Sequence, residues 1–142
     1  MANSTNERLF QRVSHSFERQ SFLKTIGATL EQVKNGSVTV SCERAENLTQ
    51  QQGFLHGGVI TSLADVACGY AALTTAPEGY EVLSVECKIN FMRPAIGRKF
   101  TAEGRVVKAG KTLAVTEAMV TDEENAAVAV MVATMFLAEK ET

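Results

Sequence analysis

The sequence predicts an α+β fold, in which one antiparallel sheet of about six strands wraps around one long buried helix. Residues 57–75 contain no proline and are apolar on nearly every helical face, which is typical of a helix enclosed in a core. Two segments rich in β-branched residues precede this helix and four follow it. The turns between consecutive strands are too short for crossover connections, so we expect the paired strands to be antiparallel.

Ahead of the buried helix, the chain predicts a short helix and a strand hairpin. Ser4 and Glu7 form a capping-box pattern, in which the serine begins the helix. Apolar residues then recur at helical spacing over about four turns; they are Leu9, Phe10, Val13 and Phe17. From Ile26 onward apolar residues alternate around Gly36, as in a hairpin. The polar residues 43–52 are expected to form a loop.

Beyond the buried helix, four strands are expected, separated by turn-forming clusters rich in Gly, Pro, Asp and Asn. Their approximate ranges are 81–91, 98–108, 111–121 and 126–138. We expect one domain spanning residues 1–142. One helix covers only one face of such a sheet, so the other face needs cover, and this favours a dimer.

Composition and charge exclude several classes of protein. The 142 residues carry 14 basic and 16 acidic side chains, a net charge of −2, so neither a nucleic acid nor an anionic membrane is an expected partner. The longest apolar run, residues 126–138, is shorter than a membrane span. The N-terminus lacks the pattern of a secretory signal, so we expect a cytoplasmic protein. Three cysteines without a C-x-x-C pair, and two histidines far apart in sequence, predict neither a disulfide framework nor a metal site.

The positive charge is concentrated in residues 88–111, which carry seven basic side chains and a single acidic one, Glu103. A local positive stretch in an acidic protein fits a phosphate-bearing ligand. It equally fits solvated turns and strand edges, where lysine prevents unwanted pairing. The sequence alone leaves both interpretations open.

Two glycines, Gly57 and Gly58, stand where the buried helix begins. The first N–H groups of a helix lack intrahelical partners and lie at the positive end of its dipole. Without side chains in the way, these groups could hold an oxyanion. The alternative is that the glycines only allow a tight junction between loop and helix.

Asp65 is the only acidic or basic residue of the buried helix. A carboxylate in an apolar setting costs several kcal/mol unless it is hydrogen-bonded or faces a wet cavity. Eight helical residues separate it from Gly57, a rise of about 12 Å, which is too far for both to act on one small group. Asp65 therefore either works with a neighbouring subunit or has a different role.

The motifs around these residues resemble those of the hotdog-fold acyl-CoA thioesterases. They are H-G-G-x-x-x-x-L-x-D at His56–Asp65 and S-x-E-x-x-x-x-F-x-x-P at Ser84–Pro94. The most similar branch is the phenylacetate-pathway type, related to 4-hydroxybenzoyl-CoA thioesterase. The resemblance implies a homodimer whose sheets join edge to edge, further paired into a dimer of dimers, with sites at the subunit interface. It implies no cofactor and no metal.

The resemblance also implies roles for individual residues. The Gly57 N–H would polarise the thioester carbonyl, and Asp65 of the opposing subunit would be the general base or the nucleophile. The Gln50 amide would support the carbonyl, although Gln51 and Gln52 are hard to distinguish from it. Ser84 would help to hold the water, and we assign His56 to holding the loop.

The remaining expectations concern substrate binding and the competing functions. Residues expected to contact acyl-CoA are Gly58, Arg93, Arg98, Lys99 and Lys108. One alternative is a non-catalytic acyl-CoA sensor, against which Asp65 argues, since binding alone gains nothing from a buried carboxylate. The other is a hydratase or dehydratase, which needs a histidine paired with an acid; His56 lacks the flanking pattern for that.

Overall fold

The computed structural model describes residues 2–141 and contains four helical segments and six strands. The helical segments are α1 (Ala2–Glu18), α2 (Ser21–Thr25), the 3-10 turn η1 (Glu46–Leu48) and α3 (Gly57–Thr75). The strands are β1 (Thr29–Lys34), β2 (Ser37–Glu43), β3 (Tyr80–Phe91), β4 (Lys99–Ala109), β5 (Leu113–Asp122) and β6 (Ala127–Glu139).

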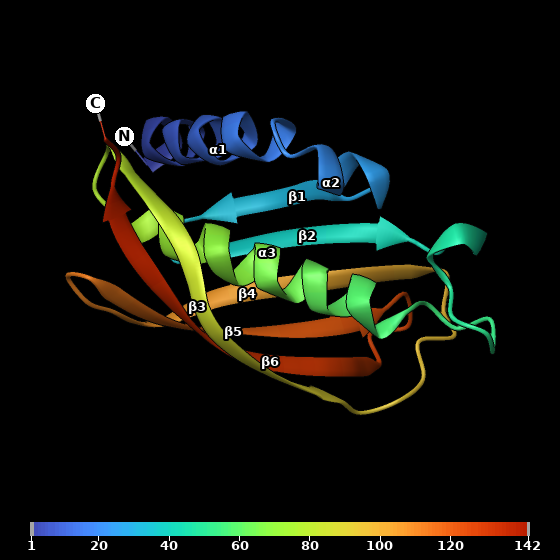
Figure 1. The fold of residues 1–142 in the computed structure, drawn as a ribbon. Helices are drawn as coiled ribbons and strands as arrows, with labels where there is room; N and C mark the ends of the chain where they lie inside the picture. The colour runs from blue at the N-terminus through green and yellow to red at the C-terminus, as the bar shows by residue number, and fades with distance from the viewer. Residues whose placement is uncertain (1, 142) are drawn as a thin grey trace.

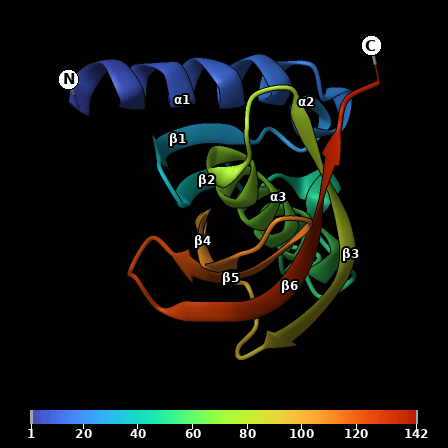
Figure 2. The ribbon, with the colours of Figure 1, turned by 90° about the vertical axis from the view of Figure 1, so that its left-hand side faces the viewer.

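The strands form one antiparallel sheet in the order β1-β2-β4-β5-β6-β3. The sheet curves around α3, and α1 lies beside β1 across the open side of the curve (Figures 1 and 2). Side chains on the concave face alternate with outward ones, so that Phe100, Ala102, Ala114 and Ala118 are buried against α3. The expected fold class is confirmed.

A glycine on β4 lets α3 lie directly on the sheet. A Cβ atom at Gly104 would be 2.3 Å from the carbonyl carbon and oxygen of Ala67, which belongs to the α3 backbone. The small residues Ala64, Ala67 and Ala71 on α3 are likewise fully buried. The close approach therefore depends on small side chains on both elements.

Helix α1 is anchored to the far end of α3 by one arginine. The Arg12 guanidinium donates hydrogen bonds to the carbonyl oxygens of Ala76 and Pro77, each at 2.8 Å, and to that of Tyr80 at 3.4 Å. These carbonyls follow the last turn of α3, where backbone acceptors lack intrahelical partners. Val13 and Phe17 add buried apolar contacts on the same side of α1.

Two local expectations are wrong. Helix α1 begins at Ala2, so Ser4 lies inside it rather than capping its start. The strand expected from Ile26 begins only at Thr29, because residues 21–25 form the short helix α2 and Ile26 is its C-cap. Leu23 and Ile26 are both buried, so the apolar spacing that suggested a strand belongs partly to this helical turn.

Helix α3 is long and apolar enough to span a membrane by length and composition alone. In this fold most of it is buried by the sheet. Its apolarity is therefore accounted for by its place in the core.

Candidate active site

The carboxylate of Asp65 is hydrogen-bonded to a strand that lies beside α3. Ser84 on β3 donates its hydroxyl to Asp65 Oδ1 at 2.6 Å, and its Oγ lies 3.4 Å from the sulfur of Met135. Asp65 is half-buried. The expectation that the helix is fully enclosed is therefore wrong for the helix face that carries Asp65. Two residues that were each expected in the site, Asp65 and Ser84, are thus brought together within one chain.

Asp65 and Ser84 line a cavity of about 570 Å³ between α1, α3 and β3, here named the Asp65 cavity. On α3 its lining residues are Asp65, Val66, Gly69, Tyr70 and Leu73. From β3 come residues 80–84, and from α1 and the residues after it come Arg12, His15, Ser16, Arg19 and Gln20. The lining is mixed, with apolar side chains such as Val66 and Leu73 and charged ones such as Arg19 and Glu81. A hollow with both kinds of side chain can hold and orient a small molecule.

At the other end of the helix, His56 is the N-cap of α3. Its Nδ1 accepts a hydrogen bond from the Gly58 N–H at 2.8 Å, and its carbonyl accepts from Val59 and Ile60. Among the described residues, the Gly57 N–H has no hydrogen-bond partner. One backbone donor therefore remains available at the positive end of the helix dipole.

Both glycines at this helix start are closely approached by a ring. A Cβ atom at Gly57 would lie 3.3 Å from the Phe91 ring, and one at Gly58 would lie 3.0 Å from Nδ1 of His56. Phe91 is 53% exposed, so it covers Gly57 from the open side of the molecule instead of filling the core. At both glycines, a larger side chain would contact one of these rings closely.

Gln50 organises the loop that leads to α3. Its side-chain oxygen accepts from the N–H groups of Gln52 and Phe54, and its Nε2 donates to the Gln52 side chain at 2.9 Å. Gln51 and Gln52 are exposed, whereas Gln50 is half-buried. Of the three glutamines, Gln50 is the one whose amide is built into the loop.

The two halves of the site lie apart in one chain. Asp65 and Gly57 occupy the same helix, eight residues and about 12 Å of helix rise from each other. Ser84 contacts Asp65, and Phe91 lies against Gly57. One protomer therefore presents a carboxylate and a backbone donor that cannot reach the same carbonyl group.

The basic residues of the 88–111 stretch are spread over several elements. Arg93 is exposed in the loop between β3 and β4, and Lys108 is exposed near the end of β4. Two of the other cations are paired: Arg105 with Glu117, and Lys99 with Glu31 at 3.4 Å. The Arg98 side chain is exposed, and its backbone N–H donates to Glu123.

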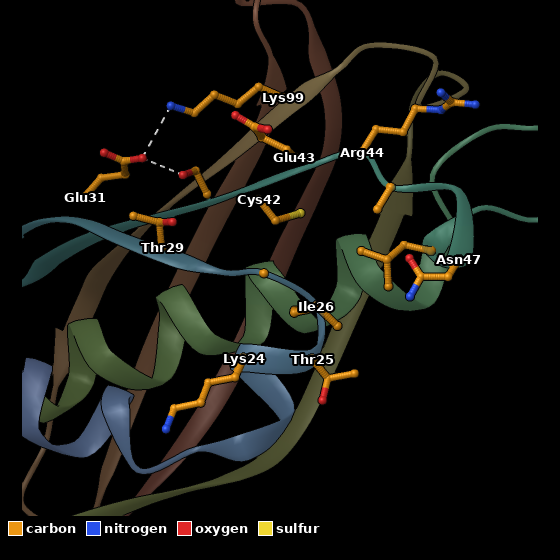
Figure 3. Close-up of a pocket in the computed structure, with 14 residues that line it drawn as sticks. Lys24, Thr25, Ile26, Thr29, Glu31, Cys42, Glu43, Arg44, Asn47 and Lys99 are labelled. Carbon is orange, nitrogen blue, oxygen red and sulfur yellow. Dashed lines mark hydrogen bonds and ion pairs between the residues drawn. The ribbon is translucent and has the colours of Figure 1, made fainter.

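Lys99 lines a second cavity of about 470 Å³, between α2, β1, β2 and η1 (Figure 3). There Ser41 donates to Glu31 at 2.5 Å, and this hydrogen bond, together with Lys99, lowers the pKa of Glu31. The residues lining this cavity include none of those around Asp65. Lys99 is thus engaged away from the Asp65 cavity.

Two of the three cysteines are unsuited to act as nucleophiles. Cys42 and Cys68 are buried, and burial raises the pKa of each thiol to about 11. A thiol with such a pKa remains protonated and unreactive at neutral pH. Among the described residues, no three His, Cys, Asp or Glu side chains are grouped to hold a metal ion.

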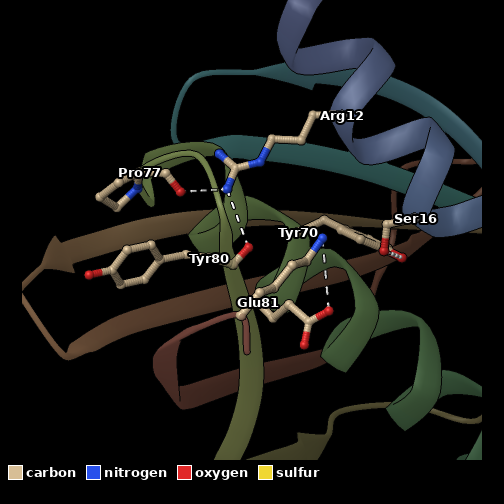
Figure 4. Close-up of polar contacts among 7 residues, drawn as sticks. Arg12, Ser16, Tyr70, Pro77, Tyr80 and Glu81 are labelled. Atoms are coloured by element: carbon tan, nitrogen blue, oxygen red, sulfur yellow. Dashed lines mark hydrogen bonds and ion pairs between the residues drawn. The ribbon is translucent and has the colours of Figure 1, made fainter. Parts of the chain in front are cut away.

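Sequence reasoning missed the contribution of α1. Tyr70 on α3 shares a hydrogen bond of 3.0 Å with Ser16 (Figure 4). It also accepts a hydrogen bond of 2.6 Å from Gln20. These partners are 54 and 50 residues from Tyr70 in sequence. No local motif connects them, so only the tertiary structure could reveal that α1 closes the cavity.

A six-stranded antiparallel sheet curved around one long helix, with a carboxylate in the middle of that helix and a free N–H at its start, defines a hotdog-fold protein. The family model of the thioesterase superfamily matches residues 52–129, more than half of the chain. The chain therefore belongs to the thioesterase superfamily, and its enzymatic class is thioester hydrolase.

Individual relatives agree with this assignment. A thioesterase family protein from Silicibacter pomeroyi is similar at 38% identity and a TM-score of 0.90, over 93% of this chain and 99% of that one. The 1,4-dihydroxy-2-naphthoyl-CoA hydrolase of Listeria monocytogenes is 31% identical over 70% of this chain and 81% of its own length. The PaaI protein of the Escherichia coli phenylacetic acid degradation operon shares the fold, with a TM-score of 0.86 over 96% of both chains at 22% identity.

Proposed function

We propose that this thioesterase hydrolyses acyl-CoA esters at a site shared between two subunits, with Asp65 of one protomer and the Gly57 N–H of its partner acting on the same thioester. The observation that carries the proposal is the hydrogen bond from Ser84 to Asp65 at the wall of the Asp65 cavity. The Listeria relative is a hydrolase named for an acyl-CoA, which supports the choice of CoA ester.

In the general-base route, Asp65 takes a proton from water while the water oxygen attacks the thioester carbon. The carbonyl electrons move to oxygen, and the Gly57 N–H of the partner subunit stabilises the resulting oxyanion. The intermediate then expels the CoA thiolate, which takes up the proton from Asp65, leaving a carboxylic acid and free CoA. In the nucleophilic route, Asp65 attacks the carbon directly, CoA leaves as the thiolate, and water hydrolyses the mixed anhydride.

Other residues have supporting roles in this proposal. Ser84 fixes the Asp65 carboxylate and sits where the attacking water would be held. The Nδ1 of His56 accepts a hydrogen bond from the Gly58 N–H, so the Gly57 N–H is left as the free donor. Gln50 shapes the loop before α3, and Gly58 gives the substrate access to the helix start.

The two edges of the sheet differ in a way that supports edge-to-edge dimerisation through β3. The β1 edge is short and lies beside α1. The β3 edge has twelve residues, and Leu83, Val85 and Phe91 along it are 60%, 59% and 53% exposed. A long apolar edge strand without cover is a template for pairing with another chain. Pairing two β3 strands would set the two α3 helices beside each other.

The outer face of the sheet supports a further pairing of dimers. Apolar side chains exposed there lie on β4, β5 and β6; they are Val107, Leu113, Val115, Met119, Val132 and Phe136. Large apolar side chains exposed together on one face are typical of a protein–protein contact surface. A dimer of dimers would bury this face.

Replacement of Asp65 by asparagine tests the assignment. Asparagine keeps the size of the side chain and can still accept a hydrogen bond from Ser84, but it cannot take a proton or attack a carbonyl. We expect kcat for acyl-CoA hydrolysis to fall by about 10² to 10⁴ while substrate still binds. Thiol release with a chromogenic disulfide measures the rate. Wild-type turnover by a folded Asp65→Asn protein would remove Asp65 from the mechanism.

A further inference from the structure

Gly69 lies one helical turn after Asp65, and nothing in the described packing requires a glycine there. A Cβ atom at Gly69 would meet no atom within 4 Å, whereas one at Gly104 would overlap the backbone of α3. A glycine inside a helix lowers helix stability relative to alanine. The space beside Gly69 is part of the Asp65 cavity. Gly69 thus leaves space in the cavity, although it lowers the stability of α3.

From Asp65 the cavity continues along one face of α3 toward its C-terminal end. Val66, Gly69, Tyr70 and Leu73 follow at spacings of three and four residues, so they lie on one face of the helix. Leu73 is eight residues beyond Asp65, which corresponds to about 12 Å. The cavity therefore extends two helical turns from the carboxylate.

The far part of this cavity is closed by α1. Tyr70 is hydrogen-bonded to Ser16 and Gln20. Arg12 fixes α1 to the carbonyls that follow α3 (Figure 4). The Arg12 guanidinium donates to three carbonyl oxygens, so its role is to anchor α1. A fixed wall at this end gives the cavity a defined length.

The lining chemistry favours the acyl group over the CoA phosphates. Val66, Leu73 and Val82 supply apolar surface. Of the lysine and arginine side chains around the cavity, Arg12 is bound to backbone, Lys140 lies 3.9 Å from Glu81 and Arg19 is exposed on α1. The basic stretch 88–111 contributes no residue to this lining. An apolar group attached to the reacting carbonyl matches the part of the lining that Val66, Leu73 and Val82 form.

We propose that the acyl group lies in the Asp65 cavity along α3, and that Gly69 sets the length of acyl group that the enzyme accepts. The inference rests on the proposed acyl-CoA hydrolysis. An extended alkyl chain advances roughly 1.3 Å per carbon, because its bonds of about 1.5 Å zigzag. About 12 Å between Asp65 and Leu73 then admits roughly eight carbons. A large side chain at Gly69, about 6 Å from Asp65, would stop the chain near four carbons.

The test compares Gly69→Leu with wild type on acetyl-, butanoyl-, hexanoyl- and octanoyl-CoA. We expect kcat/KM for octanoyl-CoA to fall by at least about 10-fold in the variant, and that for acetyl-CoA to change by less than about 3-fold. Gly69→Ala should give a smaller shift in the same direction. Thr75→Leu places the same side chain on α3 outside the cavity lining, and it should leave the preference for chain length unchanged.

The outcomes separate this inference from the function on which it rests. A wild-type enzyme that cleaves none of the four substrates would overturn the proposed acyl-CoA hydrolysis. Equal losses on short and long substrates, or dissociation of the oligomer in size-exclusion chromatography, would overturn the role of Gly69 alone. Melting temperatures of Gly69→Leu and Gly69→Ala at or above that of wild type would show that a selective loss is not unfolding.

Discussion

At the scale of single residues, one neighbouring side chain sets the hydrogen bonding of each group in the proposed site. Ser84 orients the Asp65 carboxylate, and the His56 side chain takes the Gly58 N–H, so that Gly57 is left as the free donor. Gly57, Gly58 and Asp65 could be singled out from the sequence because the glycines stand at a helix start and the acid lies on an apolar helix. Ser84 and His56 were predicted only through the resemblance to the thioesterase family. It could not predict the contact between Phe91 and Gly57, since 34 residues separate the two.

Replacement of Gly57 by proline tests the free N–H. Proline has no donor, yet it suits the first position of a helix, and His56 before it already has an extended backbone with ψ of 137°. Loss of one oxyanion donor costs about 2.7 to 4 kcal/mol, so kcat should fall by about 10² to 10³. Gly57→Ala is the matched control, because its Cβ meets the same Phe91 ring but its N–H remains. If both variants lost the same activity, crowding rather than the missing donor would be responsible.

At the scale of elements, α3 was predicted with its observed bounds, because no helix breaker occurs before the cluster at residues 76–79. The four strands after it were predicted to within a few residues, since turn-forming residues separate them. The short helix α2 was missed because five residues carry too little periodicity to distinguish a helical turn from a strand. The closure of the cavity by α1 depends on contacts more than 50 residues apart in sequence, such as that of Ser16 with Tyr70.

The close contact between α3 and β4 leads to a prediction about the stability of the fold. Gly104→Ala should destabilise the fold by about 1 to 3 kcal/mol, because the added methyl group would overlap the Ala67 backbone and α3 would have to move. Denaturant unfolding measures the change. Glu103→Ala, an exposed neighbour on the same strand, should stay within about 0.5 kcal/mol of wild type. A neutral Gly104→Ala would mean that α3 does not lie as close to β4 as described.

At the scale of the whole molecule, the basic stretch 88–111 is where the CoA phosphates are expected. The structure narrows the candidates for phosphate binding, because Lys99 and Arg105 are paired with acids, whereas Arg93, Arg98 and Lys108 are exposed and form no ion pair with another described residue. We expect the double variant Arg93→Gln and Arg98→Gln to raise KM for acyl-CoA by about 10-fold with little change in kcat, since phosphates are bound equally in ground and transition states.

Lys34→Gln is the control for this change of charge, because Lys34 is exposed at the end of β1, away from the loop that carries Arg93. The KM of a thioester without the nucleotide should be insensitive to all of these substitutions. An unchanged KM for acyl-CoA at low salt would indicate that the basic stretch is only a set of solvated turns.

The central claim, that Asp65 and Gly57 act together across a subunit interface, is tested by mixing two inactive variants. Asp65→Asn and Gly57→Pro subunits, once exchanged, should form heterodimers with one intact and one doubly defective site. A one-to-one mixture should then recover roughly one quarter of wild-type activity, because half of the dimers are mixed and each has one working site. Native mass spectrometry verifies the exchange. Absence of recovered activity in a mixture that contains heterodimers would place both groups on one chain and contradict the shared site.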